Sequence, residues 1–133
     1  MSKHSDSDTR LISFLQASPT PYHAVANMGR KLQDAGFQRL DETCAWQLAP
    51  GQNYYVTRND SSLIAFKTGS GDLVSKGVRL AGAHTDSPCL KIKPNPEILK
   101  NNYLQLGVEV YGGVLLNPWY DRDLSIAGRV NYI

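Results

Sequence analysis

Apolar residues recur with two different periods along this 133-residue chain, and the change of period restricts the folds open to it. Within residues 25–35 they follow one another at helical spacing. Within residues 104–110 they alternate with polar or small residues, which is the period of a half-buried strand. We therefore predict an α/β fold for the first part and an all-β segment from about residue 94 onward.

The second helix has clear boundaries in the sequence. Thr20 is the predicted N-cap, and Pro21 suits the first helical position. Gly36 is expected to take the left-handed conformation that ends the helix, and Phe37 then folds back onto Leu32. This pattern predicts a helix from about residue 21 to residue 35.

The segment before that helix is less regular. Residues 1–10 are polar and lack the apolar core of a signal peptide, so we expect a flexible tail. Residues 11–15 give a short helix an apolar face. The Ser-Pro-Thr-Pro run at 18–21 stops it, because proline disfavours a helix that precedes it.

Strands are expected after the helices. Residues 54–58 and 63–66 read as an antiparallel hairpin across a turn at 59–61. Residues 68–77 read as an exposed loop, and residues 78–83 as a buried strand.

The later part also reads as strands. Residues 90–93 resemble a half-exposed strand that the Pro-Asn-Pro run at 94–96 breaks. A further strand is expected over 104–110 and another over 126–133. We therefore place the N-terminal part of an α/β domain at 11–93 and the start of a β-rich domain, which is incomplete, at 94–133. The chain stops inside a strand-like run, so we expect it to be truncated.

Composition excludes several classes of function. The net charge is +2 and the basic residues are scattered, so nucleic acid is not expected as a partner. The apolar stretches are too short for a membrane span. Cys44 and Cys89 form no CxxC pair, which favours reduced thiols and a cytoplasmic location.

His84 and Asp86 are the sharpest chemical feature. They lie two positions apart at the end of the strand expected over 78–83, and Pro88 then opens a loop. Neutral imidazole is a common zinc ligand, and a carboxylate can bind the metal or orient the histidine. A hydrogen-bonded turn is the competing interpretation. One histidine cannot hold zinc, which takes three or four protein ligands.

The other candidates are weaker. His4 lies in the polar tail and His23 near a helix start, where a packed or partly exposed histidine is expected. The segment 119–124 could hold a catalytic carboxylate pair, but a structural turn in which Arg122 pairs with a carboxylate is favoured. Cys89 has no histidine at a telling spacing, so a nucleophilic role is not expected.

Five motifs in order resemble the M18 metallopeptidases, the family of the aspartyl aminopeptidases. The resemblance runs from about residue 11 to residue 133, and its motifs occupy residues 18–24, 55–65, 82–90, 105–113 and 119–130.

The resemblance implies a two-domain enzyme, with a zinc-peptidase α/β domain and an inserted β-rich dimerisation domain. It implies that His84 is a zinc ligand and that Asp86 supports the metal site in catalysis. It also implies two zinc ions, peptide substrates with acidic first residues, and a homo-oligomer. The remaining family ligands and the general-base glutamate have no counterpart here, so we expect this chain alone to be inactive.

Two alternatives stay open. One is a related metal-dependent amidase or deacylase that shares the His-x-Asp strand end. The other is a non-catalytic module that uses exposed strand edges for assembly.

Overall fold

The chain forms two units, each described by itself. A computed structural model describes residues 5–132. The first unit runs to Thr85 and takes up the chain again from Ala127, and the second unit is Asp86–Ile126. Helices and strands are both present, so the predicted α/β class is confirmed. The domain boundary near residue 94 remains a prediction.

The first helix, α1, spans Asp6–Gln16. Ser5 caps it through a capping box, in which the Ser5 hydroxyl accepts from the Asp8 amide and the Asp8 carboxylate accepts from the Ser5 amide. The flexible tail that we predict over 1–10 is therefore wrong from Asp6 onward, because these polar residues cap and begin a helix. Residues 1–4 lie outside the described residues.

The second helix, α2, spans Pro21–Asp34 and confirms the predicted boundaries. The Thr20 hydroxyl accepts from the His23 amide, as an N-cap does. Gly36 has a φ of 82°, and the Phe37 amide donates to the Leu32 carbonyl oxygen at 2.9 Å. These bonds form the Schellman termination expected from the sequence.

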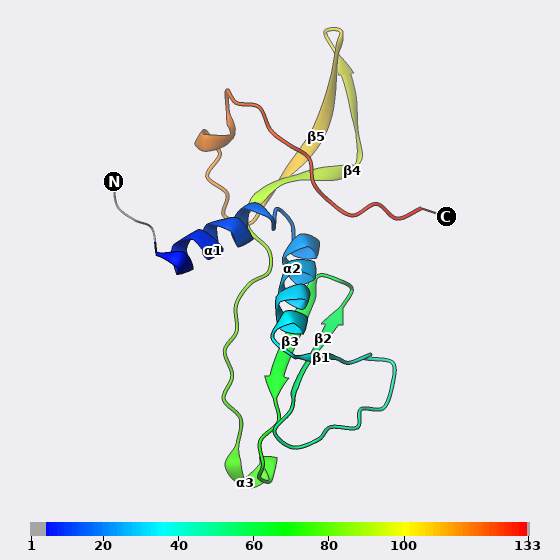
Figure 1. Ribbon diagram of the computed structural model, residues 1–133. Helices are drawn as coiled ribbons and strands as arrows, with labels where there is room; N and C mark the ends of the chain where they lie inside the picture. The colour runs from blue at the N-terminus through cyan, green and yellow to red at the C-terminus, as the bar shows by residue number, and fades with distance from the viewer. Residues whose placement is uncertain (1–4, 133) are drawn as a thin grey trace. The chain divides into compact units, whose positions relative to one another are not determined.

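A three-stranded sheet lies against α2 in the first unit (Figure 1). Its strands are β1, Gln38–Arg39; β2, Asn53–Arg58; and β3, Ser62–Lys67. β2 is central, parallel to β1 and antiparallel to β3, which confirms the predicted hairpin. The buried apolar residues come from α2 and β2 and are Ala24, Val25, Tyr54, Tyr55 and Val56.

The turn between β2 and β3 has left-handed backbone. Asn59 and Asp60 have φ values of 51° and 53°, and the Ser61 amide donates to the Arg58 carbonyl oxygen at 3.1 Å. Asparagine and aspartate tolerate this conformation better than other residues with a side chain. The turn is thus held closed at the position where the sequence predicted it.

The segment after β3 departs from expectation. Its loop contains a short helix, α3, Leu73–Lys76, and the buried strand predicted over 78–83 is absent. Leu80 is 92% exposed. A strand needs a neighbour for its backbone hydrogen bonds, and none of the strands within residues 5–132 pairs with this segment.

The second unit is built on one hairpin of two long strands, β4, Cys89–Lys100, and β5, Tyr103–Tyr111. The strand break predicted at 94–96 is wrong, because β4 continues through it. The prolines are accommodated by a shift of register between Ile92 and Glu97. Gly107 lies opposite, where an added Cβ would be 3.4 Å from the Pro96 carbonyl oxygen.

The chain leaves this hairpin through a short 3-10 helix, η1, Asn117–Trp119. The strand predicted over 126–133 is not formed in the part of it that the structure describes, and Val130 is 84% exposed. As with 78–83, no strand among the described residues pairs with it. Within residues 5–132, no helix has the length and apolar character needed to cross a bilayer.

Candidate metal-binding segment

The segment His84-Thr85-Asp86 crosses the division between the two units. His84 and Thr85 end one stretch of the first unit, and Asp86 begins the second. His84 is exposed, while Thr85 and Asp86 are half-buried. The three residues lie in irregular backbone rather than on a strand.

Thr85 is tied to the β2–β3 turn of its own unit. Its hydroxyl donates a hydrogen bond to the Ser61 carbonyl oxygen at 2.8 Å. Because the β2–β3 hairpin is fully paired, this bond connects the irregular segment to a regular one. The backbone that carries His84 is therefore attached to the sheet one residue away.

Asp86 is bound by a residue at the end of β5. The Tyr111 hydroxyl donates to Asp86 Oδ2 at 2.7 Å. The hydrogen bond to the Asp86 carboxylate, helped by its negative charge, raises the pKa of the Tyr111 phenol above its ordinary value. Tyr111 thus stays a proton donor to this carboxylate at neutral pH.

The surroundings hold Tyr111 in place. It pairs with Cys89 in the hairpin register, and the Lys91 ammonium lies 5.6 Å from the centre of its ring. Gly112 follows with a φ of 67°, and an added Cβ there would be 3.5 Å from the Pro88 ring. The start of the second unit and the end of β5 are therefore closely packed within one unit.

The side chains of His84 and Asp86 are of the types that bind zinc, but two ligands are fewer than a zinc site needs. An imidazole and a carboxylate are both zinc ligands, and structural or catalytic sites take at least three from the protein. Among residues 5–132, no three His, Cys, Asp or Glu side chains form a group that could hold a metal ion. The described residues therefore supply only part of a ligand set.

The other candidates do not add to this set. His23 is exposed, and its Nδ1 lies 2.8 Å from the Thr20 hydroxyl, so the expected packed or partly exposed histidine is confirmed. His4 lies outside the described residues. Cys44 and Cys89 are free thiols.

The segment 119–124 forms a turn, as favoured from the sequence. Asp121 has a left-handed φ of 53°. Arg122 donates to the Pro118 carbonyl oxygen at 3.3 Å rather than to a carboxylate, so the expected pairing is wrong. The 3-10 helix η1 turns the chain, and this brings the Pro118 carbonyl oxygen within reach of the Arg122 side chain.

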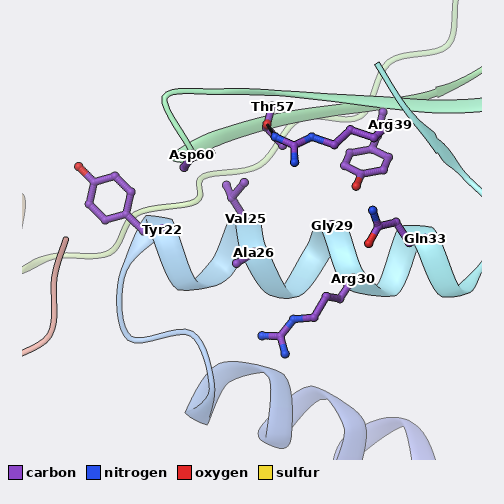
Figure 2. A pocket seen from close by; sticks show the side chains of 10 residues that line it. Tyr22, Val25, Ala26, Gly29, Arg30, Gln33, Arg39, Thr57 and Asp60 are labelled. Atoms are coloured by element: carbon purple, nitrogen blue, oxygen red, sulfur yellow. Dashed lines mark hydrogen bonds between the residues drawn. The ribbon is translucent and has the colours of Figure 1, made fainter. Parts of the chain in front are cut away.

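A groove of about 310 Å³ runs between α2 and the sheet of the first unit (Figure 2). Val25 and Gly29 face it from α2, and Arg39 crosses the sheet to bond the Thr57 hydroxyl at 3.1 Å. Arg30 points away from the sheet in Figure 2 and donates to Asn27. His84 does not line this groove, so the groove and the candidate metal residues are separate features.

Sequence reasoning missed Tyr111 as a neighbour of Asp86. The residue ends a clean alternating strand, directly before the Gly112-Gly113 turn. That position places it at the base of a hairpin, but its opposite residue depends on the register shift in β4. The sequence pattern therefore indicates that Tyr111 lies at the base of a hairpin, but it does not indicate that Asp86 is its hydrogen-bond partner.

Comparison with known proteins places these residues in a family. Residues 14–133 match the family described as aminopeptidase I zinc metalloprotease, M18. A probable M18 family aminopeptidase 2 of Pseudomonas putida is 61% identical over 125 residues, which are 94% of this chain and 29% of the relative. Its counterpart in Pseudomonas paraeruginosa is 63% identical over 122 residues, 92% of this chain and 28% of the relative.

Solved structures agree. Yeast aminopeptidase 1 matches with a TM-score of 0.81 and 33% identity, covering 91% of this chain and 29% of the yeast chain. The S. cerevisiae mApe1 dodecamer matches with a TM-score of 0.79 and 34% identity, covering 89% and 28%. This chain therefore spans less than a third of the length of these proteins. Because the family match covers residues 14–133, the chain belongs to the M18 family of zinc metalloproteases.

Proposed function

We propose that this chain is part of a zinc-dependent aminopeptidase that removes N-terminal residues from peptides. The observation that carries the proposal is the M18 match over residues 14–133, which includes the His84-Thr85-Asp86 segment. The relatives at 61% and 63% identity are named as probable aminopeptidases of the same family.

His84 is proposed as a zinc ligand. The residue is exposed to solvent, and the Thr85 hydroxyl next to it attaches the backbone to the β2–β3 turn. Bound zinc supplies a Lewis acid that polarises a peptide carbonyl and lowers the pKa of a bound water.

Asp86 is proposed to support the metal site in catalysis. Its carboxylate can either bind the metal or accept a hydrogen bond from a ligand histidine, which fixes the orientation of that histidine. Its half-buried position and its bond to Tyr111 restrict the directions it can take.

The 133 residues alone are proposed to be inactive. Residues 5–132 contain no group of three possible ligands, and a zinc site takes three or four. A complete site with two zinc ions would need donors beyond this set. The gene product that carries this chain is therefore the material on which activity should be measured.

The substrate preference, the dimerisation domain, the oligomeric state and the cellular location are each proposed on a specific observation. A preference for acidic first residues, and the β-rich dimerisation domain from about residue 94, rest on the motif resemblance to the aspartyl aminopeptidases. A homo-oligomer is supported by the dodecameric S. cerevisiae relative. A cytoplasmic location is in keeping with two free thiols.

The test is substitution of His84 in the complete gene product. His84→Ala should lose zinc, measured by metal analysis after dialysis, and should lose hydrolysis of aminoacyl anilides by at least about a hundredfold. His23→Ala is the matched control, because that histidine is also exposed and bonds only to its own helix cap in the contacts described above.

Substrate preference is read in the same assay. Asp- and Glu-anilides should be cleaved faster than the Ala-anilide, as the acidic preference requires.

Wild-type zinc content and activity in His84→Ala would remove His84 from the site, and a zinc-free, inactive wild type would overturn the proposed function itself.

A further inference from the structure

The Tyr111–Asp86 contact joins two residues at the open end of the hairpin in the second unit, opposite its turn. Asp86 precedes β4 and Tyr111 ends β5, so the strands of the hairpin bring them together. The 2.7 Å distance is that of a strong hydrogen bond from a hydroxyl to an ionised carboxylate.

The tyrosine can act on one oxygen of the carboxylate. A carboxylate offers about four acceptor positions, and a phenol uses one of them. The bond is to Oδ2, so it sets the rotation of the carboxylate group and leaves it able to accept from other partners at the same time.

The position of the phenol is itself well determined. Its residue pairs with Cys89 across the hairpin, and the Lys91 ammonium lies over its ring. Lys91 also approaches Glu109 at 3.7 Å, although both side chains are at least half exposed and this ion pair adds little. The phenol therefore holds Asp86 from a paired strand rather than from a loop.

We propose that Tyr111 is a positioning residue for Asp86, which sets the direction of the carboxylate toward the metal site. This inference rests on the proposed function, in which Asp86 supports that site. Tyr111 touches neither substrate nor metal in this proposal, and its effect passes through the carboxylate. Residues that orient the groups around a metal change its affinity by about 10- to 100-fold when they are lost.

The experiment measures zinc affinity in the complete gene product by competition with a chromophoric chelator. Tyr111→Phe removes one oxygen and should weaken zinc binding by about 10-fold or more. Tyr103→Phe is the matched control, because Tyr103 lies on the same strand and is 71% exposed. It should bind zinc as the wild type does.

A double-mutant cycle separates positioning from a general structural effect. If Tyr111 acts through the carboxylate, Tyr111→Phe should have no further effect on zinc affinity in an Asp86→Asn background. The urea unfolding midpoint of each variant, measured without metal, shows whether the fold has changed. If Tyr111→Phe is less stable than the wild type, it is studied at a temperature where it is folded. The d–d absorption of bound Co²⁺ is then measured in place of zinc affinity.

Two results would overturn the inference. One is wild-type zinc affinity in Tyr111→Phe, and the other is an equal loss of affinity in the Asp86→Asn background. Either result together with loss of zinc in His84→Ala would leave the proposed function standing. Retention of zinc by His84→Ala and Asp86→Asn alike would instead remove both residues from the site, and a zinc-free, inactive wild type would reject the proposed function.

Discussion

Arg129 donates a hydrogen bond from Nη1 to the Asn59 carbonyl oxygen at 2.9 Å, across 70 positions of the chain. Its guanidinium also lies 4.4 Å from the centre of the Tyr22 ring. Thr85 bonds to Ser61 in the same turn. The two segments of the first unit that flank the second unit in sequence are thus both attached to the turn between β2 and β3.

Arg129→Ala should destabilise the first unit. The variant loses the bond to Asn59, the contact with Tyr22 and a weak, partly exposed ion pair with Asp60 at 3.9 Å. The expected loss of unfolding free energy is roughly 1–2 kcal/mol, most of it from the first two contacts. Urea denaturation measures it.

The control for this change is Arg10→Ala. Arg10 pairs with Asp6 at 3.3 Å within one helix, and both side chains are mostly exposed. Its loss should therefore cost less than about 0.5 kcal/mol. Equal effects of the two substitutions would show that Arg129 makes no anchoring contact.

Asn102→Gly should stabilise the hairpin of the second unit. Asn101 and Asn102 connect β4 to β5, and their φ values are 54° and 62°. Asn-Gly is the preferred pair for a two-residue turn with both residues left-handed, because glycine has no Cβ to clash. The expected gain is about 0.5 kcal/mol, measured from cross-strand NMR contacts between Lys100 and Tyr103.

Asn95→Gly is the control for Asn102→Gly, and it should have the opposite effect on stability. Asn95 lies within β4, where glycine costs chain entropy without relieving strain, so this variant should be less stable by about 0.5–1 kcal/mol. A gain from both substitutions would indicate that the hairpin turn is not strained.

Acid should loosen the helix α3 through its cap. Asp72 accepts from the Ser75 and Val74 amides, and these bonds lower the pKa of its carboxyl below the ordinary 3.8. Because the folded pKa is the lower one, the stabilisation is present above pH 3.8 and is lost as the pH falls through the folded pKa.

NMR titration of the Ser75 amide between pH 5 and pH 2 follows this loss. The midpoint should lie below 3.8. Asp72→Asn keeps a capping oxygen and removes the charge, so its α3 should show no such transition. A midpoint at or above 3.8 in the wild type would contradict the capping contact.

Local signals explain what could be predicted of the fold. Thr20, Pro21 and Gly36 act through bonds within a few residues, and the helix between them formed where expected. The hairpin of β2 and β3 is likewise a pairing of near neighbours across one turn. In both cases the partners of the backbone groups lie close in sequence, so the residue pattern was sufficient.

Distant pairing decided the rest. The residues 78–83 have the apolar pattern of a buried strand, yet a strand forms only where another strand meets its backbone groups, and none in residues 5–132 does so. The prolines at 94 and 96 suggested a break, but Gly107 on the opposite strand leaves room for β4 to bulge and continue.

The sequence by itself predicted a metal-site role for His84 and Asp86, because that prediction follows from the residue types, their spacing and the family motif. Only the tertiary structure paired Asp86 with Tyr111, and Thr85 and Arg129 with the turn at 59–61. The physical reason is that such contacts depend on strand register and chain reversal, which no short stretch of sequence specifies.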